Sequence, residues 1–234
     1  MLFESRVAPL VPYSIRGVIW YQGESNASEA LIYRRLLPLM IRDWRHLWGQ
    51  GDFPFLQVQL ANFGSAAVEP GRSQWAELRD AQATALSEPN TGMVVAIDVG
   101  EANDLHPPDK RSVGLRLARW ALAETYFRGG EPSGPLYAGS TIGPGGSMRI
   151  HFRHGAGLAT RDGNPVRHLA IAGTDRNFVT AESRIDGETL VAWHPQVSRP
   201  AAARYAWADN PEGCNLINAA GLPASPFRTD AWGG

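Results

Sequence analysis

Three short runs of apolar, β-favouring residues divide the first half of the chain at regular intervals. The runs cover residues 16–21, 55–60 and 93–98. Helical patterns follow them over residues 27–48, 74–86 and 108–127. Because parallel strands are joined by crossover helices, this alternation predicts an α/β fold with a parallel sheet covered by helices on both faces.

The first helix has the clearest predicted ends. Asn26 is the expected N-cap, and Glu29 three residues later completes a capping-box pattern. At the other end, Gly49 and Gly51 are expected to terminate the helix, since glycine readily adopts the left-handed conformation there.

The second half of the chain has a different sequence pattern. A cluster of glycine and proline follows Gly129, and short alternating runs separated by Asx-Gly turns come after it. The runs cover residues 148–152, 169–172, 189–193 and 203–207. We therefore expect a small antiparallel β region, and divide the chain into an α/β domain over residues 1–128 and a β-rich region over residues 129–234.

Charge and cysteine content exclude several classes of protein. With 22 Lys and Arg against 23 Asp and Glu, the net charge is −1, which argues against a nucleic-acid partner. A single cysteine, Cys214, excludes an intrachain disulfide and a cysteine-cluster metal site. No apolar run is long enough to span a membrane. No segment has the basic start and apolar run of a secretory signal peptide, and we assign no localisation.

The turn after the first strand is one candidate for chemistry. Loops at the carboxyl ends of parallel strands form the usual ligand site of open α/β sheets, and Gly23, Ser25 and Ala27 approach a nucleophile-elbow pattern. The structural alternative is that Gly23 makes the turn while Ser25 and Asn26 cap the helix. The pattern taken alone favours this alternative.

The loop after the third strand is the second candidate. It contains Asp104 and His106 and precedes the last helix. A histidine that acts as general base needs a carboxylate to orient its ring, and residues two apart on an extended loop can point the same way. The alternative is a helix-entry loop in which aspartate makes the turn and proline starts the helix.

Together the two motifs resemble the sialate O-acetylesterase family, within the SGNH hydrolases. The resemblance rests on Trp20-Tyr21-Gln22-Gly23-Glu24-Ser25-Asn26 and on Asn103-Asp104-Leu105-His106-Pro107, with supporting matches at Lys110, Trp75 and residues 215–230. It spans nearly the whole chain. It implies an SGNH-like α/β fold and a serine carboxylic ester hydrolase that removes acetyl groups from sugars without metal or cofactor.

The resemblance also assigns roles to residues. His106 would be the general base, and Asp104 would orient it. The oxyanion and substrate-binding block would comprise Gln22, Gly23, Glu24, Ser25 and Asn26. Members of the family are often secreted, periplasmic or lysosomal, and the implied partner is an acetylated carbohydrate, with no nucleic acid and no membrane.

The nucleophile of the family has no counterpart in this sequence. In the family the serine comes from a Gly-Gln-Ser-Asn-type turn after an earlier strand, and the residues that precede Trp20 are too few to hold a strand, turn and helix. The chain could be the C-terminal portion of an esterase, a degenerate homologue, or an enzyme in which Ser25 replaces the missing serine.

We favour the C-terminal portion, because a sheet that lacks its first strand exposes an unpaired edge. An N-terminal segment or separate chain would then supply the serine, and we expect little esterase activity from these 234 residues alone. The alternative is a catalytically inactive homologue that binds a carbohydrate or complements a partner.

Overall fold

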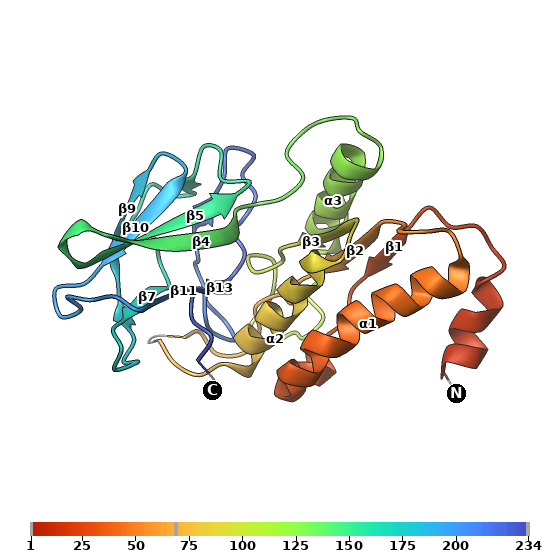
Figure 1. The fold of residues 1–234 in the computed structure, drawn as a ribbon, viewed down its shortest axis with the longest axis horizontal. Coiled ribbons are helices and arrows are strands. Elements are labelled where there is room, and N and C mark those ends of the chain that lie inside the picture. The colour runs from red at the N-terminus through yellow and green to blue at the C-terminus, as the bar shows by residue number, and fades with distance from the viewer. Residues whose placement is uncertain (1, 68–69, 233–234) are drawn as a thin grey trace.

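The computed structural model describes residues 2–67 and 70–232. An α/β half and a β half lie side by side, joined by the segment that follows α3 (Figure 1). No helix in the described residues is both long enough and apolar enough to cross a membrane.

Three parallel strands form the sheet of the α/β half. They are β1 (Val18–Trp20), β2 (Phe55–Val58) and β3 (Thr91–Val94), in the order β1-β2-β3. Both pairs are parallel, and all four residues of β2 are buried. The predicted parallel sheet is confirmed, although each strand is shorter than the apolar run that predicted it.

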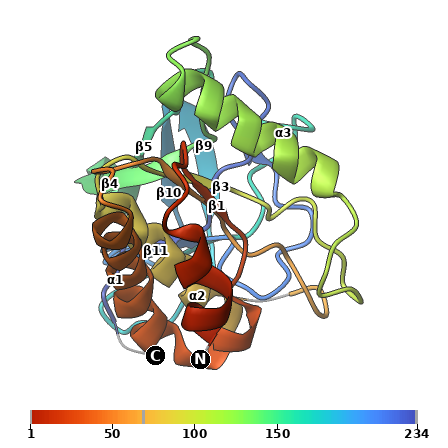
Figure 2. The same cartoon turned by 90° about the vertical axis from the view of Figure 1, so that its right-hand side faces the viewer.

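Helices cover both faces of this sheet, as expected from the sequence. They are α1 (Ala30–Trp48), α2 (Gln74–Ala83) and α3 (Lys110–Trp120). Side chains of α1 and α2 share one core with Phe55, whereas Val113 of α3 packs with Val58 and Val94. Figure 2 shows α1 and α2 on one side of the strands and α3 on the other.

Short 3₁₀ and π turns extend or connect these helices. The 3₁₀ turns are η2 (Ala8–Leu10), η3 (Glu24–Glu29), η4 (Thr84–Ser87) and η6 (Pro144–Gly146). The π turns are η1 (Phe3–Val7) and η5 (Ala121–Thr125). The turn η3 matters most for function, because it carries the motif that follows β1.

The predicted capping box at the start of α1 is wrong. Glu29 occupies the N-cap position, and no side chain caps the helix. Asn26 lies within η3, where its side chain accepts a hydrogen bond from Gln22 instead. The predicted C-terminal end is confirmed, since Gly49 has a φ of 63° and its N–H donates to the Arg45 carbonyl.

Two four-stranded antiparallel sheets form most of the β half. One has the order β4-β5-β10-β9, with β4 (Leu136–Gly143), β5 (Ser147–Arg153), β10 (Thr189–Trp193) and β9 (Glu182–Asp186). The other has the order β13-β11-β7-β8, with β13 (Phe227–Arg228), β11 (Ala202–Tyr205), β7 (Leu169–Ala172) and β8 (Val179–Thr180). A separate pair joins β6 (Ala159–Thr160) to β12 (Leu216–Ile217).

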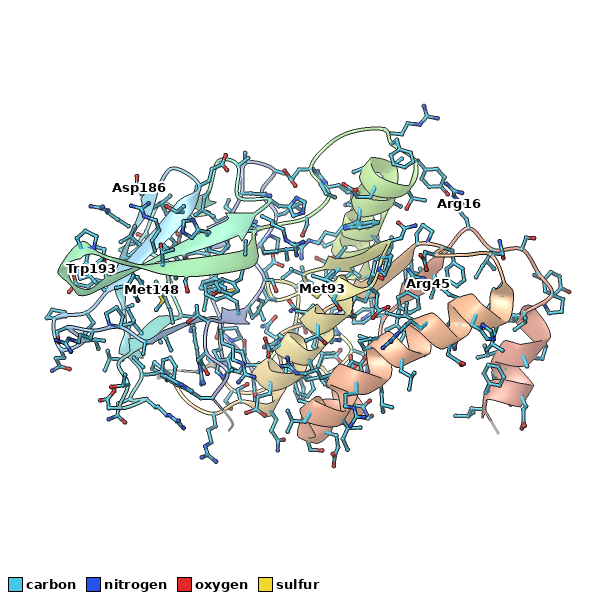
Figure 3. All side chains as sticks on the ribbon, viewed as in Figure 1. Arg16, Arg45, Met93, Met148, Asp186 and Trp193 are labelled. Atoms are coloured by element: carbon cyan, nitrogen blue, oxygen red, sulfur yellow. The ribbon has the colours of Figure 1, made fainter. Side chains whose placement is uncertain are left out.

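The two larger sheets share one apolar core. Met148 of β5 and Leu190 of β10 pack with Ile171 of β7 and Tyr205 of β11. Figure 3 shows Met148 within this β half, and Met93 within the α/β half. The predicted antiparallel region is therefore confirmed, with strands at all four of the predicted runs.

Candidate active site

The loops that follow β2 and β3 lie against each other at the carboxyl edge of the sheet. The Gly100 N–H donates to Asn62 Oδ1 over 2.8 Å, and the Gly64 N–H donates to the Ala102 carbonyl over 3.0 Å. A Cβ added at Gly100 would lie 2.1 Å from the Asn62 carbonyl oxygen, so only glycine allows this approach. This packing positions the backbone that leads to His106.

The segment after β1 reaches the same region through Tyr21. Lys110, in the first turn of α3, lies with Nζ 5.1 Å from the centre of the Tyr21 ring. Its Nζ also donates to the Pro107 carbonyl over 2.7 Å. Because Pro107 directly follows His106, this cation–π contact links the two predicted motifs at one edge of the sheet.

The turn at Gly23 is packed tightly against α2. A Cβ added at Gly23 would lie 3.1 Å from Gln82 Nε2 and 3.2 Å from Leu78 Cδ2. Gln82 is fully buried, and its Nε2 donates to the Gln22 carbonyl over 3.1 Å. Its Oε1 accepts from the Leu60 N–H. One glutamine therefore joins the turn after β1 to the chain that leaves β2.

Side-chain hydrogen bonds order the residues on either side of Gly23. Gln22 Nε2 donates to Asn26 Oδ1 over 2.8 Å, and the Tyr33 hydroxyl donates to Gln22 Oε1 over 3.1 Å. Burial, followed by the negative charge of Glu24, raises the pKa of the nearby Tyr21 phenol. Of the predicted oxyanion block, Gln22 and Gly23 are thus held by residues of α1 and α2, and Asn26 is held through Gln22.

His106 lies on the exposed surface of its loop. Asp104 Oδ1 accepts a hydrogen bond from the His106 backbone N–H over 2.7 Å, which shapes the loop as an Asx turn. The His106 ring makes no hydrogen bond to the described residues. The carboxylate of Asp98, which precedes this loop, forms ion pairs with Arg116 and Arg161 instead.

Ser25 is exposed on η3, and its hydroxyl makes no hydrogen bond within the described chain. Sequence reasoning had not identified Tyr33 or Gln82 as part of the site. No periodicity or motif pairs either of them with Gln22, because the contacts cross from a loop to two helices. Within the described residues, no group of three or more His, Cys, Asp or Glu side chains could hold a metal ion.

Comparison with known proteins identifies the family. Residues 3–123 match the model of the carbohydrate esterase family described as sialic acid-specific acetylesterase. The chain belongs to this family. The match includes both motif loops and all three strands of the parallel sheet.

Individual relatives support the assignment. The chain is 28% identical to the sialate O-acetylesterase of Mus musculus over 97% of its own length and 46% of the relative. It is 32% identical to that of Pongo abelii, over 97% and 48%. A crystal structure of a carbohydrate acetylesterase from Xanthomonas citri superposes with a TM-score of 0.91 and is 42% identical, covering 97% of this chain and 53% of that one.

The chain thus spans about half the length of the curated relatives that it matches. The high TM-score confirms the SGNH-like α/β fold together with the C-terminal β region. The parallel sheet, the turn at Gly23 and the loop of His106 are therefore features of a carbohydrate esterase fold.

Proposed function

We propose that this chain provides the histidine-bearing part of a serine carbohydrate O-acetylesterase similar to sialate O-acetylesterases. The proposal rests mainly on one observation: the loops that carry Gln22–Asn26 and His106 come to one edge of the sheet, linked by Tyr21 and Lys110. Loops at this edge are the usual ligand site of such sheets. The substrate class is an acetylated sugar, as the family name indicates.

In the proposed reaction, a serine hydroxyl attacks the acetyl carbonyl carbon while His106 accepts the serine proton. Donors in the segment Gln22–Asn26 stabilise the oxyanion that forms. Collapse of this intermediate breaks the bond to the sugar oxygen, which takes the proton from His106. Water, deprotonated by His106, then attacks the acetyl-enzyme and releases acetate and the free serine.

The nucleophilic serine in this proposal comes from outside the 234 residues, on a segment that pairs with β1. Among the described strands, β1 pairs with β2 alone, and Ile19 at its centre is 70% exposed. The outer side of α1 also exposes Leu31, Ile32 and Leu39. A free strand edge and exposed apolar side chains each favour a covering segment.

An esterase assay of the purified chain tests the source of the nucleophile. We expect little hydrolysis of an aryl acetate by the 234-residue chain, and the same low rate for Ser25→Ala. Robust turnover that Ser25→Ala abolishes would identify Ser25 as the nucleophile and contradict an external serine.

The histidine is tested in a longer polypeptide that adds the serine-bearing strand. There we expect acetate release that His106→Ala reduces by about 10³-fold or more. Asp104→Asn tests the neighbouring carboxylate. Unchanged turnover in His106→Ala would contradict the assigned base.

A binding function is the second candidate, because the His106 ring and the Ser25 hydroxyl make no hydrogen bond to each other or to other described groups. Isothermal titration with an O-acetylated sugar, combined with acetate detection, distinguishes the two functions. Binding without acetate release, in the longer polypeptide as well as in the chain alone, would favour the binding module.

A further inference from the structure

We propose that Tyr33 and Gln22 are positioning residues, which hold the Asn26 side-chain amide with its oxygen occupied and its Nδ2 free to donate to the substrate. The inference rests on the proposed function, since it concerns the oxyanion block. It adds to that function a defined orientation for one donor and identifies the residues that impose it.

A continuous chain of hydrogen bonds carries the inference. Trp20 Nε1 donates to the Tyr33 hydroxyl over 3.4 Å, which donates to Gln22 Oε1 over 3.1 Å. Gln22 Nε2 donates to Asn26 Oδ1 over 2.8 Å. Asn26 Nδ2 donates to no atom of the described residues, so it is the unused donor at the end of this series of hydrogen bonds.

The direction of donation follows from the groups involved. The Trp20 indole N–H can only donate, so the Tyr33 oxygen accepts from it. The single Tyr33 proton faces two acceptors on Gln22, the carbonyl and Oε1, which lie 3.2 and 3.1 Å away. Donation to the closer acceptor, Oε1, leaves the Gln22 amino group facing Asn26 Oδ1. Without this constraint, the Asn26 amide could turn its oxygen outward, and that oxygen would repel a developing oxyanion.

Burial keeps this arrangement in place. Tyr33 is 5% exposed, and desolvation by burial raises the pKa of its phenol, so it remains a proton donor at neutral pH. The Gln22 backbone is held from the other side by the buried Gln82. Donors that are oriented before the reaction stabilise charge without reorganisation. The structure thus supplies a preorganised donor.

Kinetics of the active longer polypeptide test the positioning role. We expect Tyr33→Phe to lower kcat about 5- to 10-fold, the effect of one neutral hydrogen bond. Gln22→Glu should lower kcat about 100-fold, because its carboxylate can only accept and would recruit Asn26 Nδ2. KM should change less than about twofold in both variants.

Two comparisons separate positioning from a general structural effect. In an Asn26→Ala background, Tyr33→Phe should cause almost no further loss of kcat. Trp48→Phe removes a similar bond, from Trp48 Nε1 to the Tyr13 carbonyl, at the other end of α1 and should leave kcat unchanged. Additive losses in the double variant, or an equal loss in Trp48→Phe, would overturn the proposal.

Side-chain amide NMR of the 234-residue chain provides a readout without activity. Tyr33→Phe should shift the NH₂ resonances of both Gln22 and Asn26, and Trp48→Phe should shift neither. If these shifts appear while the longer polypeptide is inactive, the positioning proposal stands and the esterase proposal fails. If turnover is present and the Asn26 resonances do not respond, the positioning proposal fails alone.

Discussion

Cys214 has an environment that suppresses thiol chemistry. Burial, followed by the negative charge of Asp98, raises the pKa of this thiol from 9.0 to about 11. Because the thiolate is the reactive species, we expect the folded chain to react very slowly with a disulfide reagent near pH 8, and the urea-unfolded chain to react rapidly. Stoichiometric labelling of the folded chain within minutes would contradict this expectation.

The same shift affects stability in alkaline solution. The folded-state pKa lies above the unfolded value, so the unfolded chain loses its thiol proton first. Stability from this group is therefore full below pH 9.0 and falls as the pH rises towards about 11. In Cys214→Ala, the free energy of unfolding measured by urea titration should not show this part of the decline at alkaline pH.

Residue-scale reasoning from the sequence selected His106 and Asp104 as candidates but did not settle which of their atoms bond to each other. Asp104 was expected to orient the His106 ring, and the hydrogen bond that the structure shows goes to the His106 backbone N–H. The role of the remaining Asp104 oxygen stays a prediction. Spacing identifies residues that can meet, whereas the side-chain atom that bonds depends on the path of the loop.

At the scale of elements, the packing of α3 on β3 includes a close contact at Gly92. A Cβ added at Gly92 would lie 2.2 Å from Cε2 of the Trp120 ring. We expect Gly92→Ala to lower the free energy of unfolding by about 1–3 kcal/mol, since the ring cannot move without disturbing the core. Urea denaturation measures this loss.

A second glycine provides the matched control. Gly114 lies within α3, and nothing would contact a Cβ added there. Gly114→Ala should stabilise the chain by about 0.5–1 kcal/mol through helix propensity. If Gly92→Ala were also neutral or stabilising, the close contact with Trp120 would not constrain the packing of α3 on β3.

Element prediction succeeded where periodicity was strong and failed where local irregularity hid it. The strand β4 was not predicted, because its pairing with β5 shifts register between Tyr137 and Gly139, which breaks the alternation of buried and exposed residues. The start of α1 was misplaced because Asn26 has the composition of a cap but bonds to Gln22. Both errors arise from contacts outside the local pattern.

At the scale of the whole molecule, Arg79 joins the two halves. It is fully buried on α2, and its guanidinium donates to the carbonyls of Leu60, Ala61, Ala208 and Asp209 over 2.6 to 2.9 Å. Burial lowers the pKa of Arg79 to about 9, so the group stays charged at neutral pH. The β half therefore depends on a side chain from the α/β half.

Removing this guanidinium should destabilise both halves together. We expect Arg79→Met to lower the free energy of unfolding by about 2–4 kcal/mol, because buried carbonyls lose their donors. Calorimetry of the parent chain should show one transition. Arg149→Met, which removes a partly exposed pair with Asp186, should cost less than about 1 kcal/mol. Equal losses in the two variants would contradict the role of Arg79.

The sequence by itself determined the α/β class, the antiparallel C-terminal region and the two loops that carry the family motifs. These features follow from local periodicity and turn chemistry, which act over a few residues. Only the tertiary structure decided that Lys110 meets Tyr21, that Tyr33 orders Gln22 and Asn26, and that Arg79 joins the halves. Those contacts join residues separated by up to 130 positions, and only the tertiary fold brings such residues within bonding distance.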